Sequence, residues 1–515
     1  MHLNQSKSET AWFLAALAIL ILLSFFTALG SVPLFDVDEG AFSEATREMI
    51  VSKNYLTTYL NGAPRFDKPI LIYWLQVAAV KLFGLNEFSF RLPSALAGTA
   101  WATSIFLFVR KESGNRQAFF AAALMVLSLQ VIVISKAAIA DGVLNYLLAI
   151  TMFALLHHYK TGSKQALHFA FASSGLGMLT KGPIAIIIPF VVTFLFSLQE
   201  GRLKKWLGMI LNPTGIILFL IISFPWYLLE YRDQGMSFVN EFFFKHNISR
   251  FNTSFEGHSG SLFYYLPVIL IGIMPFTGLF FTVLFKLKTL LSDKTNRFLL
   301  IWFGFVFLFF SFSGTKLPHY MIYGYTPLFI LIARALPLTK HPESLALWPL
   351  LLLAALAFLP MLLQTAVHQI NDDYIQALLA GAIELTGKTY LFVVIAAIIG
   401  VTAIQFLPHF SAAGKLIATG VIFSCLINFY LTPLAGRLLQ EPIKQAAFLA
   451  KKEGYKIVMW EIYNPSFLVY SESFVEKRHP EPGEIVLTTV KQLDRLDHPA
   501  ILYSKYGIIM AKLRQ

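Results

Sequence analysis

The apolar stretch AWFLAALAILILLSFFTALG, residues 11–30, decides the class of fold. It contains no charged side chain and is long enough to cross about 30 Å of hydrocarbon as a helix. Lys7 precedes it and no small-residue cleavage site follows it, so we expect it to remain in the chain as a membrane anchor. Similar apolar runs recur along most of the sequence.

The composition indicates a membrane protein built from many such segments. Of the 515 residues, 56% are hydrophobic and 14% are charged, and the mean hydropathy is +0.64. Soluble domains contain about 25% charged residues. The alternating ten-residue pattern of a membrane β-barrel does not appear, so we expect an all-α polytopic membrane protein. The single Cys425 lies in a late apolar run, which excludes a disulfide framework.

Thirteen apolar runs are predicted to span the membrane. They cover roughly residues 11–30, 89–109, 118–135, 142–159, 166–179, 183–199, 208–229, 263–286, 297–313, 320–337, 346–364, 388–407 and 413–434. The order of the third to the sixth span is the least determined part of this topology, because the connections between them are short.

The loop charges predict the orientation. With the N-terminus in the cytoplasm, the inner loops are rich in basic residues and poor in acids, as the positive-inside rule requires. These basic residues are Arg110, Lys111, Arg116, Lys160, Lys164, Arg202, Lys204, Lys205, Lys286, Lys288, Lys294 and Arg297. We therefore interpret the net charge of +12 as a topology signal of a cell inner-membrane protein, not as a nucleic-acid surface. Residues 31–88, 230–262, 365–387 and 435–515 would then face the periplasm.

The first outer loop, residues 31–88, is expected to contain two short helices. Asp36 or Asp38 can cap a helix that begins near Gly40. One face of that helix is apolar, so we expect it to lie on the membrane surface, with Glu44, Arg47 and Glu48 as a solvated face or as ion pairs. The apolar stretch 69–83 is short for a span and is predicted to be a surface or re-entrant helix.

The composition changes near Glu441, and the sequence predicts a small α/β domain over residues 441–515, called the outer domain below. A short helical pattern ends near Glu453, and strands are predicted at 456–462, 484–489, 500–503 and 507–511. It shows no recognisable catalytic motif. The chain is therefore divided into a membrane domain, residues 1–440, and this outer domain.

Polar and charged residues gather on the predicted outer side. They are Asp38, Glu39, Asp67, Lys68, Asp141, Lys181, Glu256, His258, Lys316, His319 and Tyr320. A transferase that uses a lipid-phosphate donor needs such a mixture. Cations hold the phosphate and stabilise it as it leaves, and a carboxylate orients or deprotonates the acceptor. A carboxylate with an imidazole can also bind a divalent metal such as zinc or manganese.

Five motifs carry a family resemblance over most of the chain. They are Asp38-Glu39 with a helix ending Arg47-Glu48-Met49, then Asn61-Gly62 with Phe66-Asp67-Lys68-Pro69, Thr180-Lys181-Gly182, Gly257-His258 with Tyr264-Tyr265-Leu266-Pro267, and Lys316-Leu317-Pro318-His319-Tyr320. The chain resembles the bacterial aminoarabinose transferases of lipid A. These belong to the polyprenyl-phosphate-sugar glycosyltransferases with the GT-C fold, which include the protein O-mannosyltransferases.

The resemblance implies roles for individual residues. Asp38, with Glu39, and Asp141 match acidic catalytic positions, while His258 matches a histidine near a metal site. Lys181 and Tyr320 match positions close to the donor phosphate, and Lys68, Lys316 and His319 are further residues expected to bind the substrate. Two departures stand out. Asp67, the other expected metal ligand, stands where the family usually has Glu, and His319 replaces a small residue.

Structural roles compete with these assignments. Asp38 and Asp141 could each cap a helix, Lys181 could anchor a span end among headgroups, and the two histidines could be interfacial polar residues.

The expected function is transfer of a sugar, such as 4-amino-4-deoxy-L-arabinose, from undecaprenyl or another polyprenyl phosphate to lipid A or another periplasmic acceptor, a lipid or a protein. The alternatives are a protein O-mannosyltransferase or galacturonosyl-type transferase, and a lipid-linked sugar flippase. A transporter would place its charges near the bilayer midplane, whereas these lie at one face.

Overall fold

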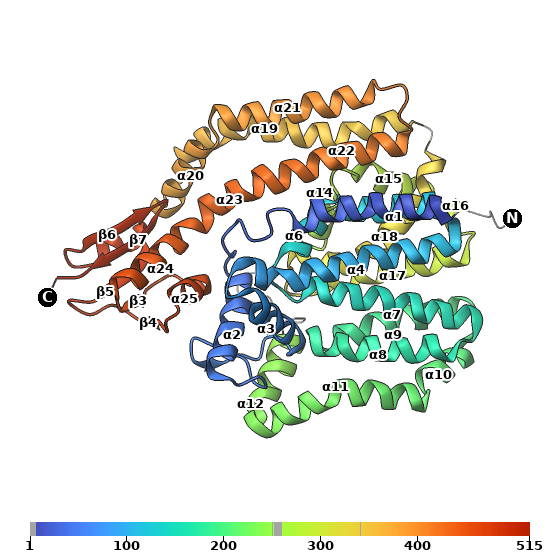
Figure 1. The fold of residues 1–515 in the computed structure, drawn as a ribbon, viewed down its shortest axis with the longest axis horizontal. Helices are drawn as coiled ribbons and strands as arrows, with labels where there is room; N and C mark the ends of the chain where they lie inside the picture. The colour runs from blue at the N-terminus through green and yellow to red at the C-terminus, as the bar shows by residue number, and fades with distance from the viewer. Residues whose placement is uncertain (1–6, 250, 252–259, 340, 515) are drawn as a thin grey trace.

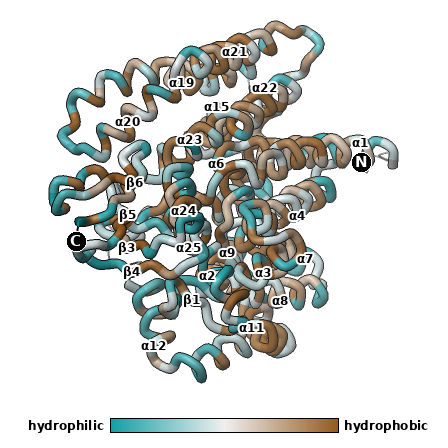
Figure 2. Tube along the Cα trace, turned by 60° about the vertical axis from the view of Figure 1, so that its left-hand side comes forward, coloured by the Kyte–Doolittle hydropathy of each residue, from teal (hydrophilic) through white to brown (hydrophobic). Residues whose placement is uncertain are grey.

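The structure, a computed structural model, describes residues 7–249, 251, 260–339 and 341–514 (Figure 1). Long helices lie side by side in a bundle. The outer domain lies at one end of this bundle, and α1 begins at the opposite end (Figure 1). Hydrophobic residues run along the bundle helices, and hydrophilic residues mark the loops and parts of the outer domain (Figure 2).

The helices of the membrane domain follow the predicted spans. They are α1 (Lys7–Ile21) with the π-helix η1 (Leu22–Phe26), α4 (Glu87–Ser113), α5 (Asn115–Val126), α6 (Leu129–Lys136), α7 (Asp141–Thr161), α8 (Lys164–Lys181), α9 (Ile184–Gln199), α10 (Leu203–Ile210), α11 (Pro213–Gln234), α12 (Met236–Phe238), η2 (Val239–Ser249), α14 (Tyr265–Gly272), α15 (Thr277–Phe285), α16 (Leu287–Leu290), α17 (Lys294–Phe312), η3 (Pro318–Gly324), α18 (Tyr325–Ala335), η4 (Leu336–Leu338), η5 (Pro342–Ala346), α19 (Leu347–Val367), α20 (Asp373–Leu385), α21 (Lys388–Gln405), α22 (Ala412–Leu426), η6 (Ile427–Leu431) and α23 (Thr432–Leu439). The prediction of a polytopic helical protein is confirmed.

The number of straight spans is smaller than thirteen. Within the described residues, 9 helices are long and apolar enough to cross a membrane, or 11 if each of two bent pairs is one span. The helices α8 and α9, predicted as spans, fall outside this set because one is less apolar and the other has 16 residues. In the bundle α8 nevertheless packs against α7 and α11, and α9 packs against α17, α8 and α7 (Figure 1).

Two predicted spans are broken. The span 118–135 bends by 68° between α5 and α6, and the span 263–286 bends by 118° between α14 and α15. Pro275 lies in the second break, where its missing N–H and its ring prevent a continuous helix. The two breaks face each other, because the N–H of Leu129 donates to the carbonyl of Met274 at 2.9 Å. The polar backbone groups exposed by the bends are thus satisfied inside the protein.

The outer loop folds into α2 (Asp38–Ser52), a short hairpin of β1 (Tyr59–Leu60) and β2 (Ala63–Pro64), and α3 (Leu71–Phe83). The expected solvated face of α2 is wrong, because Glu44, Arg47 and Glu48 are all buried. The alternative of ion pairs is confirmed by a 2.7 Å contact between Arg47 and Glu44. The expected cap is also wrong, because Val37 occupies the N-cap position without a side-chain hydrogen bond.

The outer domain forms a five-stranded sheet in the order β4-β3-β5-β7-β6. Its elements are α24 (Glu441–Glu453), β3 (Ile457–Met459), α25 (Pro465–Ser471), β4 (Glu476–Lys477), β5 (Ile485–Thr489), η7 (Val490–Arg495), β6 (Ala500–Lys505) and β7 (Ile508–Lys512). The strand β3 runs parallel to β4 and β5, and β7 runs antiparallel to β5 and β6. The four predicted strands and the helix are confirmed, while α25 and β4 were not predicted.

The outer domain is fastened to the first outer loop by polar contacts. The carboxylate of Asp36 accepts hydrogen bonds from the backbone N–H and hydroxyl of Ser466 and from the side chain of Asn464. The side chain of Asn61 bonds to the backbone of Val475 in both directions. These contacts place α25 over α2, and the turn between β1 and β2 also covers this helix, where the N–H groups of Asn61 and Gly62 donate to Glu48.

Candidate active site

A cavity of about 530 Å³ opens at the outer end of the bundle. Its polar lining residues are Asp67, Lys68, Lys181, His246, Asn247, Ser313, Tyr320 and Tyr323, and its apolar ones are Pro183, Ile184, Ile187, Phe243, Ile248, Phe251, Phe309 and Phe310. The lining comes from the outer loop, the end of α8, the start of α9, η2, the end of α17 and η3. Segments more than 200 residues apart in the sequence therefore meet at this cavity.

Asp141 and Lys181 form a buried ion pair at this cavity. The ammonium of Lys181 lies 2.7 Å from Oδ1 of Asp141 and donates to the hydroxyl of Tyr323 at 2.8 Å. Tyr323 in turn donates to the same Oδ1 at 2.5 Å. The N-cap of α7 is Ala140, without a side-chain cap bond, so Asp141 serves this pair and does not cap its helix.

His319 and Tyr320 flank the pair. The Nε2 of His319 lies 4.0 Å from Oδ1 of Asp141, and the ammonium of Lys181 lies 5.3 Å from the ring centre of Tyr320. Tyr320 lines the cavity, while His319 stands behind it within electrostatic range of Asp38 and Lys68. The tyrosine ring offers a cation–π partner that keeps the lysine directed at the cavity wall.

Asp67 occupies the side of the cavity nearest the outer loop. Its Oδ1 lies 2.8 Å from Nε2 of His246, and its Oδ2 accepts from Arg65 at 3.0 Å. Burial alone would raise the pKa of Asp67, but Arg65, His246 and Lys68 together hold it well below 3.8. Asp67 therefore stays ionised and balances the cations around it.

The three predicted phosphate-binding lysines are not equivalent. Lys68 and Lys181 both line the cavity. Lys316 is buried and donates to the carbonyl of Ser313 at 2.6 Å, and it is Ser313 that lines the cavity. Lys316 thus supports the wall from behind, whereas the other two ammonium groups are placed to meet a ligand.

The two acidic residues at the start of α2 differ in their exposure to solvent. Asp38 is exposed and lies within electrostatic range of Arg65, Tyr73 and His319. Glu39 is buried, and both of its oxygens contact Arg91, at 2.9 and 2.7 Å.

Glu39 also accepts hydrogen bonds from two backbone groups, the N–H of Phe35 at 2.8 Å and the N–H of Ala138 at 2.7 Å. Its carboxylate is fully occupied by protein donors. The geometry gives Glu39 the role of joining the outer loop to the bundle, and it leaves Asp38 as the acid accessible to a substrate.

Of the two expected metal ligands, Asp67 and His258, the structure describes only Asp67. Among the described residues, no three His, Cys, Asp or Glu side chains come together as possible metal ligands. Asp67 meets His246, not the expected His258, which lies outside the described residues together with Glu256. One carboxylate and one imidazole do not fit a closed metal site by themselves, because such sites use at least three protein ligands.

Three site residues were not singled out from the sequence. Arg65 lies two positions before Asp67, His246 lies in an outer loop, and Tyr323 lies in an apolar span. Only Arg65 had a local signal, its position beside the Phe66-Asp67-Lys68-Pro69 motif. The other two acquire their partners through tertiary contacts that no local pattern encodes.

Comparisons with known proteins agree on a family. The profile of the family described as dolichyl-phosphate-mannose-protein mannosyltransferase matches residues 67–228. An uncharacterized protein from Aquifex aeolicus (strain VF5) is 30% identical over 346 residues, which are 65% of this chain and 67% of that protein.

A second relative has a named activity. The undecaprenyl phosphate-alpha-4-amino-4-deoxy-L-arabinose arabinosyl transferase 1 of Proteus mirabilis (strain HI4320) is 30% identical over 325 residues, which are 61% of this chain. The match spans 58% of the length of that transferase.

The fold has a counterpart among solved structures. The crystal structure of ArnT from Cupriavidus metallidurans bound to undecaprenyl phosphate aligns with a TM-score of 0.80 at 19% identity, covering 99% of this chain and 98% of that one. The relatives, the family profile and the shared fold together show that the chain belongs to the polyprenyl-phosphate-sugar glycosyltransferases with the GT-C fold.

Proposed function

We propose that this protein transfers a sugar from a polyprenyl phosphate to an acceptor at the outer end of the bundle. The observation that carries the proposal is the cavity that joins Lys68 and Lys181 to a wall of aliphatic and phenylalanine side chains. A polyprenyl phosphate has the same two parts, an anionic phosphate and a long apolar tail. Lysine is a common phosphate ligand, and the apolar wall suits the first isoprene units.

The charges suit departure of a phosphate. During transfer the bond between the anomeric carbon and the phosphate oxygen breaks, and the negative charge that develops stays on the phosphate. Lys68 and Lys181 would stabilise that charge, and Asp141 would hold Lys181 in place through its 2.7 Å contact. A new bond forms between the anomeric carbon and an oxygen of the acceptor.

Asp38 is the group proposed to meet the acceptor, because it is exposed beside the cationic cluster. An acceptor hydroxyl would transfer its proton to Asp38, which would act as general base. A lipid A phosphate is already an anion and needs only to be oriented. The name of the Proteus mirabilis relative supports 4-amino-4-deoxy-L-arabinose as the sugar and undecaprenyl phosphate as the carrier.

The proposed setting is the cell inner membrane, with the N-terminus in the cytoplasm and the outer domain in the periplasm. Two observations support it, the basic inner loops and the position of the outer domain at the end opposite to α10 and α16 (Figure 1). A flippase is less well supported, because the charged cluster lies at one end of the bundle. A protein O-mannosyltransferase remains the rival within the family, since the matching family profile bears that description.

Mass spectrometry of lipid A tests the acceptor. Cells that express the protein should contain lipid A with an added aminopentose, and cells without it should not. Purified protein should also release free polyprenyl phosphate when supplied with the sugar-loaded donor and lipid A. Unmodified lipid A together with a glycosylated periplasmic protein would favour the rival, and no donor turnover with any acceptor would refute a transferase.

We also propose that Asp67 and His246 hold a divalent metal together with His258, the ligand expected from the sequence. Metal analysis of purified native protein, the His246→Ala variant and the His258→Ala variant tests this set. Zinc or manganese near one equivalent in native protein, and its loss in either variant, is the expected result. Metal-free native protein with activity unchanged by a chelator would refute it.

A further inference from the structure

A second polar cavity, of about 410 Å³, lies at the end of the bundle opposite to the candidate active site. It lies where α7 ends and α10 begins, and α10 lies far from the outer domain (Figure 1). Lys160, Arg202 and Lys205 line it, and no Asp or Glu does. Its lining therefore carries a net positive charge.

The cations of this cavity differ in how they are neutralised. Lys160 contacts both carboxylate oxygens of Glu112 at 3.0 Å. Arg202 and Lys205 form no ion pair within the described part of the chain. The neighbouring acid, Glu200, is already occupied by Lys294 and Arg297, at 2.9 and 2.6 Å. Two positive charges thus remain available to an anion from outside the protein.

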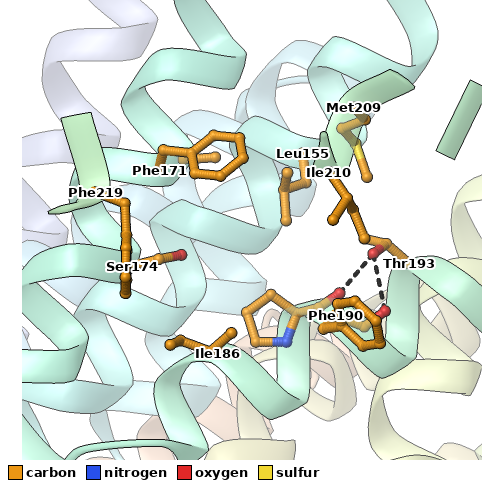
Figure 3. Close-up of a pocket in the computed structure, with 11 residues that line it drawn as sticks. Leu155, Phe171, Ser174, Ile186, Phe190, Thr193, Met209, Ile210 and Phe219 are labelled. Atoms are coloured by element: carbon orange, nitrogen blue, oxygen red, sulfur yellow. Dashed lines mark hydrogen bonds between the residues drawn. The ribbon is translucent and has the colours of Figure 1, made fainter. Parts of the chain in front are cut away.

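An apolar cavity of about 150 Å³ adjoins the basic one, and Met209 lines both. Figure 3 shows its lining, in which Phe171, Phe190 and Phe219 are the largest side chains. The only side chains with a polar atom among its eleven lining residues are Ser174, Thr193 and the thioether Met209.

Trp206 stands between the two cavities. It lines the basic cavity, and its indole N–H donates at 3.2 Å to Thr193, which lines the apolar cavity. Its ring packs edge-on against Phe190 at 5.1 Å. Tryptophan is enriched at the boundary between lipid headgroups and hydrocarbon. The position of Trp206 between the basic and the apolar cavity is therefore typical of such a boundary.

We propose that these two cavities bind an anionic phospholipid of the membrane. The phosphate of the headgroup would lie between Arg202 and Lys205, and part of one acyl chain would enter the apolar cavity below Trp206. Basic pockets between membrane helices are suited to anionic headgroups, and each nearby cation strengthens such binding. The site is separate from the candidate active site and does not depend on the sugar transferred.

Native mass spectrometry of the purified full-length protein in detergent tests the site. The protein is titrated with dioleoyl phosphatidylglycerol and, separately, with dioleoyl phosphatidylcholine. The double variant Arg202→Gln/Lys205→Gln should lose about thirty-fold in affinity for the anionic lipid, the loss expected for two such cations. The matched control is Lys204→Gln, an exposed lysine of the same helical turn that lines neither cavity, and it should bind as native protein does.

Two further measurements fix the interpretation. Inorganic phosphate at millimolar concentration should compete weakly, because it lacks the acyl chain; full competition would show that only a free anion site exists and would overturn the lipid assignment. The unfolding temperature of each variant should equal that of native protein, since the substituted side chains are exposed. Equal binding of the two lipids, or equal losses in the control and the double variant, would show only general surface charge and would refute the site.

Discussion

The ammonium of Lys181 lies 2.7 Å from Oδ1 of Asp141, and both side chains are almost completely enclosed by protein. A lysine in such a place requires a counter-charge, because an isolated buried cation is very costly. Asp141 supplies that charge before any substrate is bound. An incoming phosphate can then share the lysine without leaving it unneutralised at any stage.

Asp141→Asn should therefore destabilise the protein as well as reduce its activity. Breaking a buried ion pair from one side costs about 3 to 5 kcal/mol, since the other charge remains. The double variant Asp141→Asn/Lys181→Gln should recover most of the stability but none of the activity. Thermal unfolding and donor turnover measured on native protein and on the two variants check this. Equal stability of the Asp141→Asn variant and native protein would contradict it.

The three lysines of the predicted phosphate site should respond in a graded way. Lys68→Ala and Lys181→Ala should each weaken donor use by more than about tenfold, because charged hydrogen bonds to phosphate contribute about 1.5 to 3 kcal/mol. Lys316→Ala should have a smaller effect, since the ammonium of Lys316 donates to the carbonyl of Ser313 behind the cavity wall and Lys316 does not line the cavity. Donor affinity and turnover are measured for each variant, with the exposed Lys456→Ala of the outer domain as control. Survival of donor use in all three variants would refute the phosphate site.

Asp38→Asn should abolish transfer without affecting folding. Asp38 is exposed, so the change removes no buried contact, yet it removes the carboxylate proposed to meet the acceptor. Donor binding should persist, because Asp38 does not line the donor cavity. Transfer within a few-fold of the native rate would place the reacting group elsewhere.

The positions of the helices could be predicted from the sequence, because the length and polarity of each apolar run are local properties. Their straightness could not. Pro275 is visible in the sequence, but the 118° bend also depends on the contact between Leu129 and Met274. Similarly, Glu44 and Arg47 follow a pattern typical of a solvated helix face, yet they are buried, because α25, α3 and β1 all pack onto α2.

The candidate site was predictable to the extent that motifs mark it. Lys68, Lys181 and Tyr320 come from three separate motifs and meet at one cavity. Glu39 belongs to an equally clear motif, yet it pairs with Arg91, which lies 52 residues away and carries no motif signal. A short motif therefore identifies residues near a site, whereas the partners that occupy each side chain decide which of them remain available for chemistry.

The attachment of the outer domain should weaken as the pH rises. Burial raises the pKa of Asp36 from 3.8 to about 6, against the opposing effect of hydrogen bonds from Ser466 and Asn464. Because the folded state holds this proton more tightly, its contribution is fully present below about pH 4 and is lost as the pH passes 6. Hydrogen exchange of α25 between pH 4.5 and 7.5 should show this loss. Asp36→Asn should flatten the profile, and the exposed Asp497→Asn should leave it unchanged.

Gly40→Ala should separate the outer domain from α2. A Cβ at Gly40 would lie 2.5 Å from the backbone nitrogen of Ser466, closer than such contacts occur, and neither backbone can easily move. Within an isolated helix the same change would be favourable by about 1 kcal/mol, so helix propensity acts in the opposite direction. We expect faster hydrogen exchange in α25 and a loss of transfer of about tenfold or more, because Asp38 at the start of α2 would be displaced.

The matched control is Gly304→Ala in α17, where an added Cβ meets nothing within 4 Å. It should keep native exchange and activity, and its stability should stay equal or rise slightly for the same reason of helix propensity. If Gly40→Ala behaved like Gly304→Ala in both measurements, the outer domain would not determine the position of Asp38. If exchange in α25 increased while transfer stayed native, the contact between Gly40 and Ser466 would serve only to attach the outer domain. The membrane domain would then orient the acceptor without help from the outer domain.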